Sequence, residues 1–124
     1  MRDNLITEKT LEGKIDLDAI KNLKFDEKGL IPAIAQDIDT KEVLMIAYMN
    51  EESIRKTLSE KRACYYSRSR QQLWTKGLTS GNIQEVKGLY YDCDADSILV
   101  LVKQSGVACH TGNYSCFFNP IMEK

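Results

Sequence analysis

The distribution of hydrophobic and polar residues along the chain predicts mostly β-structure. Short apolar runs that are bounded by Gly, Asn, Asp and Ser are typical of strands. Six such runs occur, over residues 30–35, 43–49, 63–67, 73–76, 83–91 and 97–103. The last run contains the wholly apolar segment 98–102, so we expect its strand to be buried on both faces of a sheet.

One segment predicts a clear helix. Asn50 suits the N-cap position, and two glutamates follow it in the first turn, where the helix dipole favours negative charge. Ile54 and Leu58 lie four residues apart and form one apolar stripe. We expect this helix to end near Lys61 or Arg62.

The predicted elements indicate two parts of the chain. Residues 1–28 are charge-rich with a weak helical pattern over 16–22, and we interpret them as an N-terminal arm without chemistry of its own. Residues 29–124 form the main domain, whose tail from 105 to 118 looks irregular. We therefore predict an α+β fold, mostly β: a single compact, barrel-like domain with one main helix.

Composition narrows the functional classes. The 124 residues are 43% hydrophobic and 28% charged, as expected of one soluble domain. A net charge of −1 provides no general attraction to nucleic acid or to an acidic membrane. The N-terminus lacks the pattern of an export signal, so we expect a cytoplasmic protein whose four cysteines stay reduced. Reduced cysteines near a histidine and several carboxylates favour metal binding over disulfides.

Three aspartates, Asp92, Asp94 and Asp96, form the first candidate site. In an extended strand they would share one face, with Cys93 on the other. A hard cation such as Mg²⁺ prefers carboxylate oxygen and would relieve their mutual repulsion. The alternative is a solvated acidic turn that closes a hairpin before the next strand.

Three cysteines and the single histidine form the second candidate site. Thiolates from Cys93, Cys109 and Cys116 would leave one of the four tetrahedral positions of zinc open for water, which is the catalytic pattern. If Cys64 joined them, the site would be closed and structural, but its apolar strand favours a buried hydrophobic role. We favour acid/base work for His110 over direct ligation, because adjacent ligands are sterically awkward.

Basic and hydroxyl side chains form a third group of candidates. Arginine can grip phosphate with two hydrogen bonds, and a Gly, Thr and Ser loop offers N–H and hydroxyl donors. The candidate phosphate ligands are Arg68, Arg70, Lys76, Thr79 and Ser80. The alternative is a charged edge strand followed by a polar hairpin loop. Trp74 could stack on a base, although a core position is the commoner use.

Several motifs follow one another in order between about residues 29 and 118. They are Tyr66-Ser67-Arg68-Ser69-Arg70, Leu73-Trp74, Lys76-Gly77, Thr79-Ser80-Gly81-Asn82, Asp92-Cys93-Asp94-Ala95-Asp96, Gln104, Gly106, Ala108-Cys109-His110-Thr111-Gly112 and Ser115-Cys116-Phe117. This ordered set resembles the phosphoribosyl-AMP cyclohydrolase family. It departs from that pattern at Leu78, where relatives often carry glutamate, and at Asn82, where some carry histidine.

The resemblance implies a reaction of L-histidine biosynthesis, its third step. Zinc-activated water would add at C6 of the adenine ring of 1-(5-phosphoribosyl)-AMP, and the N1–C6 bond would open to the formimino aminoimidazole carboxamide ribotide. The resemblance also implies zinc on Cys93, Cys109 and Cys116 and magnesium on the three aspartates. It implies an intertwined homodimer in which each zinc is held by Cys93 of one chain and by Cys109 and Cys116 of the other.

Other functional classes fit the sequence less well. Some relatives are fused to a phosphoribosyl-ATP pyrophosphatase, and we expect this chain to lack that second activity. A non-catalytic zinc module that binds RNA or protein would need a closed four-ligand site and a basic face, and the near-neutral charge balance argues against nucleic acid. A zinc base deaminase would need the H-x-E and P-C-x-x-C motifs, and neither occurs in the chain.

Overall fold

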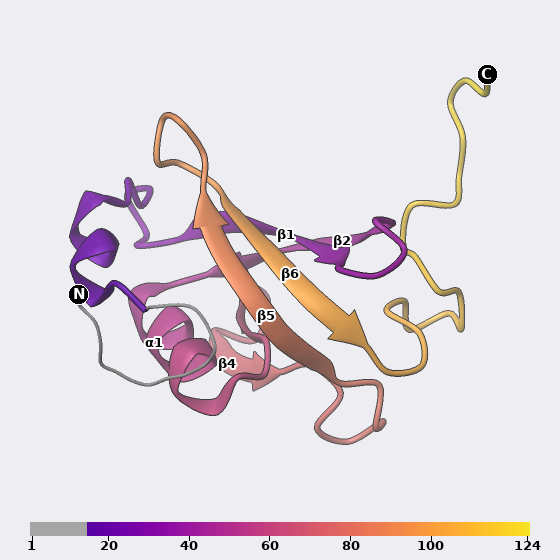
Figure 1. Cartoon of the computed structure of the whole chain (residues 1–124), viewed down its shortest axis with the longest axis horizontal. Helices are drawn as coiled ribbons and strands as arrows, with labels where there is room; N and C mark the ends of the chain where they lie inside the picture. Colours follow the sequence, from indigo (N-terminus) through magenta and orange to yellow (C-terminus); the bar gives the residue numbers. More distant parts are fainter. Residues whose placement is uncertain (1–14) are drawn as a thin grey trace.

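The computed structural model describes residues 15–124, which form one six-stranded sheet with one main helix (Figure 1). The strands are β1 (Ile31–Asp37), β2 (Val43–Met49), β3 (Cys64–Ser67), β4 (Gln72–Thr75), β5 (Gln84–Tyr91) and β6 (Ile98–Gln104), and the helices are η1 (Leu17–Asn22) and α1 (Glu51–Glu60). All six predicted strands and the predicted helix are confirmed, with ends that differ by at most about two residues.

The strand order is β4-β3-β2-β1-β6-β5, and the pairs are antiparallel except for β1 with β6. Because β1 and β6 run in the same direction, both begin at one end of the sheet. The sheet also curls back on itself. The Ala63 N–H donates to the Gln84 carbonyl at 3.0 Å, and the Val86 N–H donates to Lys61 at 2.8 Å. These bonds tie the segment before β3 to the far edge strand and give a half-barrel, so the barrel-like prediction is confirmed at that level.

The ends of α1 follow from local chemistry. The Asn50 side chain accepts a hydrogen bond from the Ser53 N–H at 2.8 Å, and the Ser53 hydroxyl accepts one from the Asn50 N–H at 2.9 Å. This reciprocal capping box satisfies two donors that a helix start leaves free. Lys61 then takes a left-handed conformation, with φ 61°, and its N–H bonds to Thr57. A left-handed residue of this kind ends the helix.

The hydrophobic core lies between the inner face of the sheet and the two helices. Ile20 of η1 and Ile54 of α1 both belong to the buried cluster. In β6, alternate residues from Ile98 to Val102 are buried, whereas Leu99 and Leu101 are only half-buried. The expectation that β6 is buried on both faces is therefore wrong for the single chain, because the helices cover only one face.

An apolar row crosses the opposite, outer face of the sheet. The registers align Ile46, Ile34, Leu99 and Tyr90 across β2, β1, β6 and β5. Ile46 is 53% exposed and Tyr90 is 59% exposed. We call these four residues the outer row. Isolated apolar side chains are common on surfaces, but a contiguous row of this kind usually marks an interaction surface.

The N-terminal arm contributes one described element. Asp16 caps η1, which confirms the predicted short helix as a 3₁₀-helix. The Lys24 N–H donates to the Ala95 carbonyl at 2.7 Å, so the arm docks beside the β5–β6 turn. The rest of the predicted arm, residues 1–14, lies outside the described residues. Within residues 15–124, no helix combines the length and the hydrophobicity that a membrane span requires.

Candidate active site

The three aspartates lie on the turn between β5 and β6. The Asp92 carboxylate accepts a hydrogen bond from the Asp96 N–H at 3.0 Å, and Ala95 has a left-handed φ of 61°. The extended geometry that would have placed Cys93 opposite the aspartates is therefore wrong. The alternative, an acidic hairpin turn, describes the backbone correctly. Asp92, Asp94 and Asp96 remain exposed at one end of the sheet.

The carboxylates on this turn affect one another's ionisation. A hydrogen bond from the Ser97 hydroxyl lowers the pKa of Asp92. The neighbouring Asp92 carboxylate raises the pKa of Asp96, since each further negative charge costs more. The Cys93 sulfur lies on the same turn, 3.8 Å from an oxygen of Asp94. The turn therefore offers three hard oxygen donors and one exposed thiol.

Cys109 and Cys116 lie on the irregular segment that follows β6. The Gly112 N–H closes a turn on the Cys109 carbonyl at 3.0 Å, with Gly112 at φ 95°. Two further bonds, from Ala108 to Tyr114 and from Cys109 to Asn113, make this segment a small hairpin. His110 lies in the turn with its side chain exposed, so it is free to meet a ligand.

The start of β2 fixes the position of Cys116. Its N–H donates to the Leu44 carbonyl at 2.7 Å, and the Ser115 hydroxyl donates to the Val43 carbonyl at 2.7 Å. The Tyr114 hydroxyl donates to the buried Asp37 carboxylate at the end of β1. Three contacts with strands more than 70 residues earlier thus hold the cysteine segment in place.

The thiols of Cys109 and Cys116 lie close enough for each to affect the pKa of the other. The Thr111 hydroxyl lies 3.0 Å from the Cys109 sulfur, and this contact lowers the pKa of Cys109. Burial raises the pKa of Cys116, so Cys109 is the first of the two to hold a thiolate. The positive charge of Lys76 lies nearby and favours both thiolates. Paired sulfurs with one readily ionised thiol suit a thiophilic metal.

The predicted phosphate ligands divide between the two ends of the sheet. The Lys76 ammonium donates to the Ala108 carbonyl beside the cysteine hairpin, and Thr79 and Ser80 lie exposed on the loop that follows it. The Arg68 guanidinium instead stacks 4.1 Å over the Tyr48 ring. Arg70 is exposed on the same β3–β4 turn as Arg68.

One chain does not bring the three predicted zinc ligands together. Cys93 precedes β6 and Cys109 follows it, so the two cysteines lie beyond opposite ends of this strand. A strand of seven residues is about 23 Å long. Within residues 15–124, no group of three or more His, Cys, Asp or Glu side chains lies close enough to hold a metal. Cys64 is fully buried, which agrees with its predicted role as a small hydrophobic residue.

Comparison with known proteins decides the family. The phosphoribosyl-AMP cyclohydrolase family model matches residues 45–118, which include all three candidate zinc ligands. The chain belongs to the phosphoribosyl-AMP cyclohydrolase family. It is 59% identical over 107 residues to the phosphoribosyl-AMP cyclohydrolase of Chloroherpeton thalassium, covering 86% of this chain and 76% of the relative. The resemblance noted from the motifs is therefore confirmed, and the chain is an enzyme of this family.

Other relatives include both single-activity and fused proteins. The phosphoribosyl-AMP cyclohydrolase of Archaeoglobus fulgidus is 65% identical over 96 residues, which are 77% of this chain and 89% of the relative. The histidine biosynthesis bifunctional protein HisIE of Bacillus subtilis is 66% identical over 95 residues, covering 77% of this chain. The match spans only 46% of that bifunctional relative.

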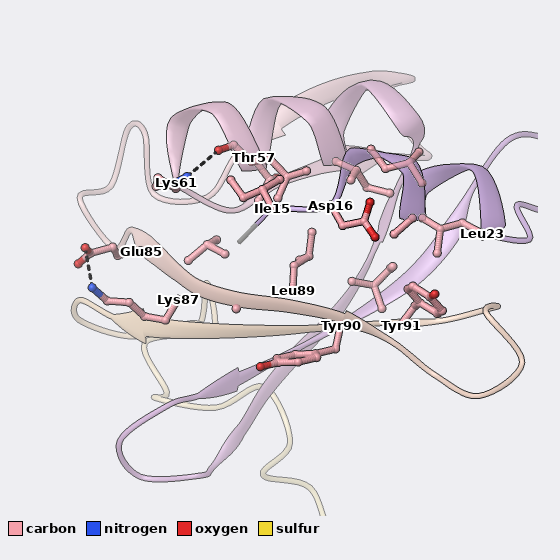
Figure 2. A pocket seen from close by; sticks show the side chains of 17 residues that line it. Ile15, Asp16, Leu23, Thr57, Lys61, Glu85, Lys87, Leu89, Tyr90 and Tyr91 are labelled. Atoms are coloured by element: carbon pink, nitrogen blue, oxygen red, sulfur yellow. Dashed lines mark hydrogen bonds and ion pairs between the residues drawn. The ribbon is translucent and has the colours of Figure 1, made fainter. Parts of the chain in front are cut away.

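A cavity of about 650 Å³ lies elsewhere in this cyclohydrolase, between η1, α1 and β5 (Figure 2). Its wall is mainly apolar and includes Leu58, Leu89 and Tyr91, with the Lys87–Glu85 ion pair at its edge. None of the predicted metal, phosphate or acid/base residues lines it. The size of this cavity therefore does not make it the reaction site.

Sequence reasoning missed the residues that hold the cysteine hairpin. Asp37 lies just beyond the predicted strand 30–35, and Tyr114 lies between two cysteines, but nothing in the local pattern links positions 77 residues apart. A signal was present in part. An aspartate is a poor strand residue, and a buried one needs a hydrogen-bonding partner.

Replacing Asp37 with asparagine should reduce the loss in the free energy of unfolding that occurs as the pH falls into the acid range. Hydrogen bonding to Tyr114 lowers the pKa of Asp37 below its ordinary 3.8. A carboxylate with a lowered folded-state pKa stabilises the protein fully above that ordinary value, and the contribution is lost as the pH falls through the lowered pKa. Urea unfolding between about pH 3 and 7 measures this. Asp39→Asn, at an exposed ion pair with Lys103, is the matched control. Parallel curves for wild type and Asp37→Asn would contradict the prediction.

Proposed function

We propose that this chain hydrolyses the N1–C6 bond of the adenine ring of 1-(5-phosphoribosyl)-AMP, giving the formimino aminoimidazole carboxamide ribotide in the third step of L-histidine biosynthesis. The observation that carries the proposal is the family match over residues 45–118, which contain the paired thiols, the acidic turn and the Thr-Ser-Gly loop. We expect the activity in the cytoplasm, where the thiols stay reduced.

The proposed zinc site uses Cys93 of one chain with Cys109 and Cys116 of a second copy. Two of the three sulfurs already meet within one chain, and Cys109 ionises readily. The third sulfur lies at the other end of β6, and a partner is needed to supply it. A two-fold axis that sets the two β6 strands antiparallel would bring each acidic turn to the partner's cysteine hairpin.

The outer row supports a dimer of this kind. Ile46, Ile34, Leu99 and Tyr90 cross four strands on the face that the helices leave uncovered. β6 lies in the middle of that row and connects the acidic turn to the cysteine hairpin. Packing the outer faces of two copies would bury apolar surface and complete two metal sites at once.

The acidic turn is the proposed magnesium site. Asp92, Asp94 and Asp96 are exposed on one short turn, and the neighbouring Asp92 carboxylate raises the pKa of Asp96. Mg²⁺ is held in proteins by one or two carboxylates together with phosphate and water oxygens. We therefore assign this turn, with Arg68 and Arg70, to the phosphates of the nucleotide.

We assign each candidate residue near the cysteine hairpin a separate role in the proposed reaction. When bound, zinc would supply the Lewis acidity that favours deprotonation of the attacking water. His110, exposed beside Cys109, would deliver a proton to N1 as the N1–C6 bond breaks. Thr79 and Ser80 would donate hydrogen bonds to phosphate oxygens, and Lys76 would add positive charge near the thiolates.

An ultraviolet assay of purine ring opening tests the proposed function. Purified protein should open the ring of phosphoribosyl-AMP, lose activity when a zinc chelator removes the metal, and regain it when zinc is restored. A zinc-loaded protein that leaves phosphoribosyl-AMP intact would contradict the proposed reaction. Activity that persists after complete removal of zinc would contradict the proposed role of the metal.

A further inference from the structure

The side-chain amide of Gln104, at the end of β6, lies where two functional loops meet. Its nitrogen is 2.9 Å from the Ser105 carbonyl oxygen and 3.4 Å from the carbonyl oxygens of Asn82, Ile83 and Val107. Two of these carbonyls belong to the loop that carries Thr79 and Ser80. The other two belong to the segment that leads to Cys109. One amide therefore bridges both loops.

A buried chain of hydrogen bonds fixes the orientation of this amide. The Gln104 side-chain oxygen accepts from the Gln84 amide nitrogen at 2.9 Å, and the Gln84 oxygen accepts from the Tyr65 hydroxyl at 2.6 Å. Gln84 and Tyr65 are fully buried. The four carbonyl oxygens around the Gln104 amide can only accept, so its nitrogen and not its oxygen must face them. The Gln104 oxygen then faces Gln84 and accepts from its nitrogen, which leaves the Gln84 oxygen to accept from Tyr65.

The same two loops also touch at Asn82. Gly106 has a left-handed φ of 73°, and a Cβ added there would come within 2.1 Å of the Asn82 side-chain oxygen. Within the loop that carries Asn82, a Cβ added at Gly77 would come within 2.3 Å of the Asn82 backbone. Asn82 is therefore held between two glycines, and Gln104 fills the junction from the core side.

We infer that Gln104 is a positioning residue for the reaction: it sets the separation between the Thr79–Ser80 loop and the Cys109–His110 turn. It acts through the loop carbonyls and does not touch the substrate. This inference rests on the proposed function, in which one loop holds phosphate and the other carries the reacting groups. An error of about 1 Å in such a separation can cost about 100-fold in rate.

Replacing Gln104 with glutamate tests the inference with the smallest change of shape. The carboxylate can still accept from Gln84, but it presents an oxygen where the loop carbonyls need a donor. We expect kcat/KM for phosphoribosyl-AMP to fall about 100-fold, with zinc content unchanged. Gln104→Met, which has similar length and no hydrogen bonds, should give a smaller fall in the same direction. The matched control is Gln36→Glu, because the Gln36 amide contacts a single exposed carbonyl, that of Lys41.

The measurements separate positioning from general stability. kcat and KM are measured well below the unfolding midpoint of each variant, with zinc saturating, and are expressed per folded chain. A fall confined to the Gln104 variants supports the inference. The inference is overturned if both variants keep kcat/KM within about threefold of wild type, or if their losses disappear after correction for folded, zinc-loaded protein. An inactive wild type would instead overturn the proposed function and with it this inference.

Discussion

Chains carrying Cys93→Ser and chains carrying Cys109→Ser should each be inactive alone and regain about a quarter of wild-type activity when mixed. In a mixed dimer, one site combines both defects, and the other combines an intact Cys93 with an intact Cys109 and Cys116. Random exchange makes about half the dimers mixed, and half the sites in those dimers are complete. Equal amounts of the two variants are unfolded and refolded together, and activity and zinc content are then measured.

Two further variants make this experiment decisive. A mixture of Cys109→Ser with Cys116→Ser chains should stay inactive, because both defects fall on the same half of the site and no mixed dimer has a complete one. Cys64→Ser alone should keep full zinc content, because Cys64 is buried in the core. If the first mixture recovers nothing while wild type refolds, the zinc ligands are not shared between chains.

Replacement of His110 with alanine should lower turnover by about 100- to 10,000-fold, the usual range for loss of a general acid or base. His110 is exposed in the turn beside Cys109, where it can reach a substrate held at the thiols. Zinc content should remain that of wild type, because the proposed ligands are untouched. Stopped-flow ultraviolet measurement of kcat, with parallel elemental analysis, checks both expectations.

A second substitution at the same position distinguishes proton transfer from hydrogen bonding. His110→Gln keeps a hydrogen-bond donor but does not titrate near neutral pH, so its turnover should remain close to that of the alanine variant. Wild-type turnover in the alanine variant would remove His110 from the mechanism. Loss of zinc from that variant would make His110 a ligand instead.

The secondary structure could be predicted because its causes are local. The helix start depends on a capping box between Asn50 and Ser53, which are three residues apart. Each strand likewise depends on an apolar run of a few consecutive residues. The burial of β6 was predicted incorrectly because its apolar run has no period that separates an inner from an outer face. Whether a second face is covered depends on what packs against it, which no single strand encodes.

The sequence offered candidate site residues but not their arrangement in the fold. The motifs identified the cysteines, the aspartates and His110, and the family match bears out the resemblance. The turn geometry of Asp92 to Asp96 was misjudged, because a left-handed residue at Ala95 reverses the chain within a segment that alternates like a strand. The chain from Tyr65 through Gln84 to Gln104 joins residues 19 and 20 positions apart, and only the folded sheet brings them together.

The placement of the acidic turn and the cysteine hairpin at opposite ends of β6 has a consequence for how the enzyme behaves on dilution. If each zinc ion is bound by cysteines from two chains, separation of the subunits removes part of its ligands. The freed thiols are then exposed to oxidation. Specific activity should then decrease as the protein is diluted. Added zinc should reduce that decrease by holding the subunits together. Quaternary assembly and metal retention would thus be a single equilibrium.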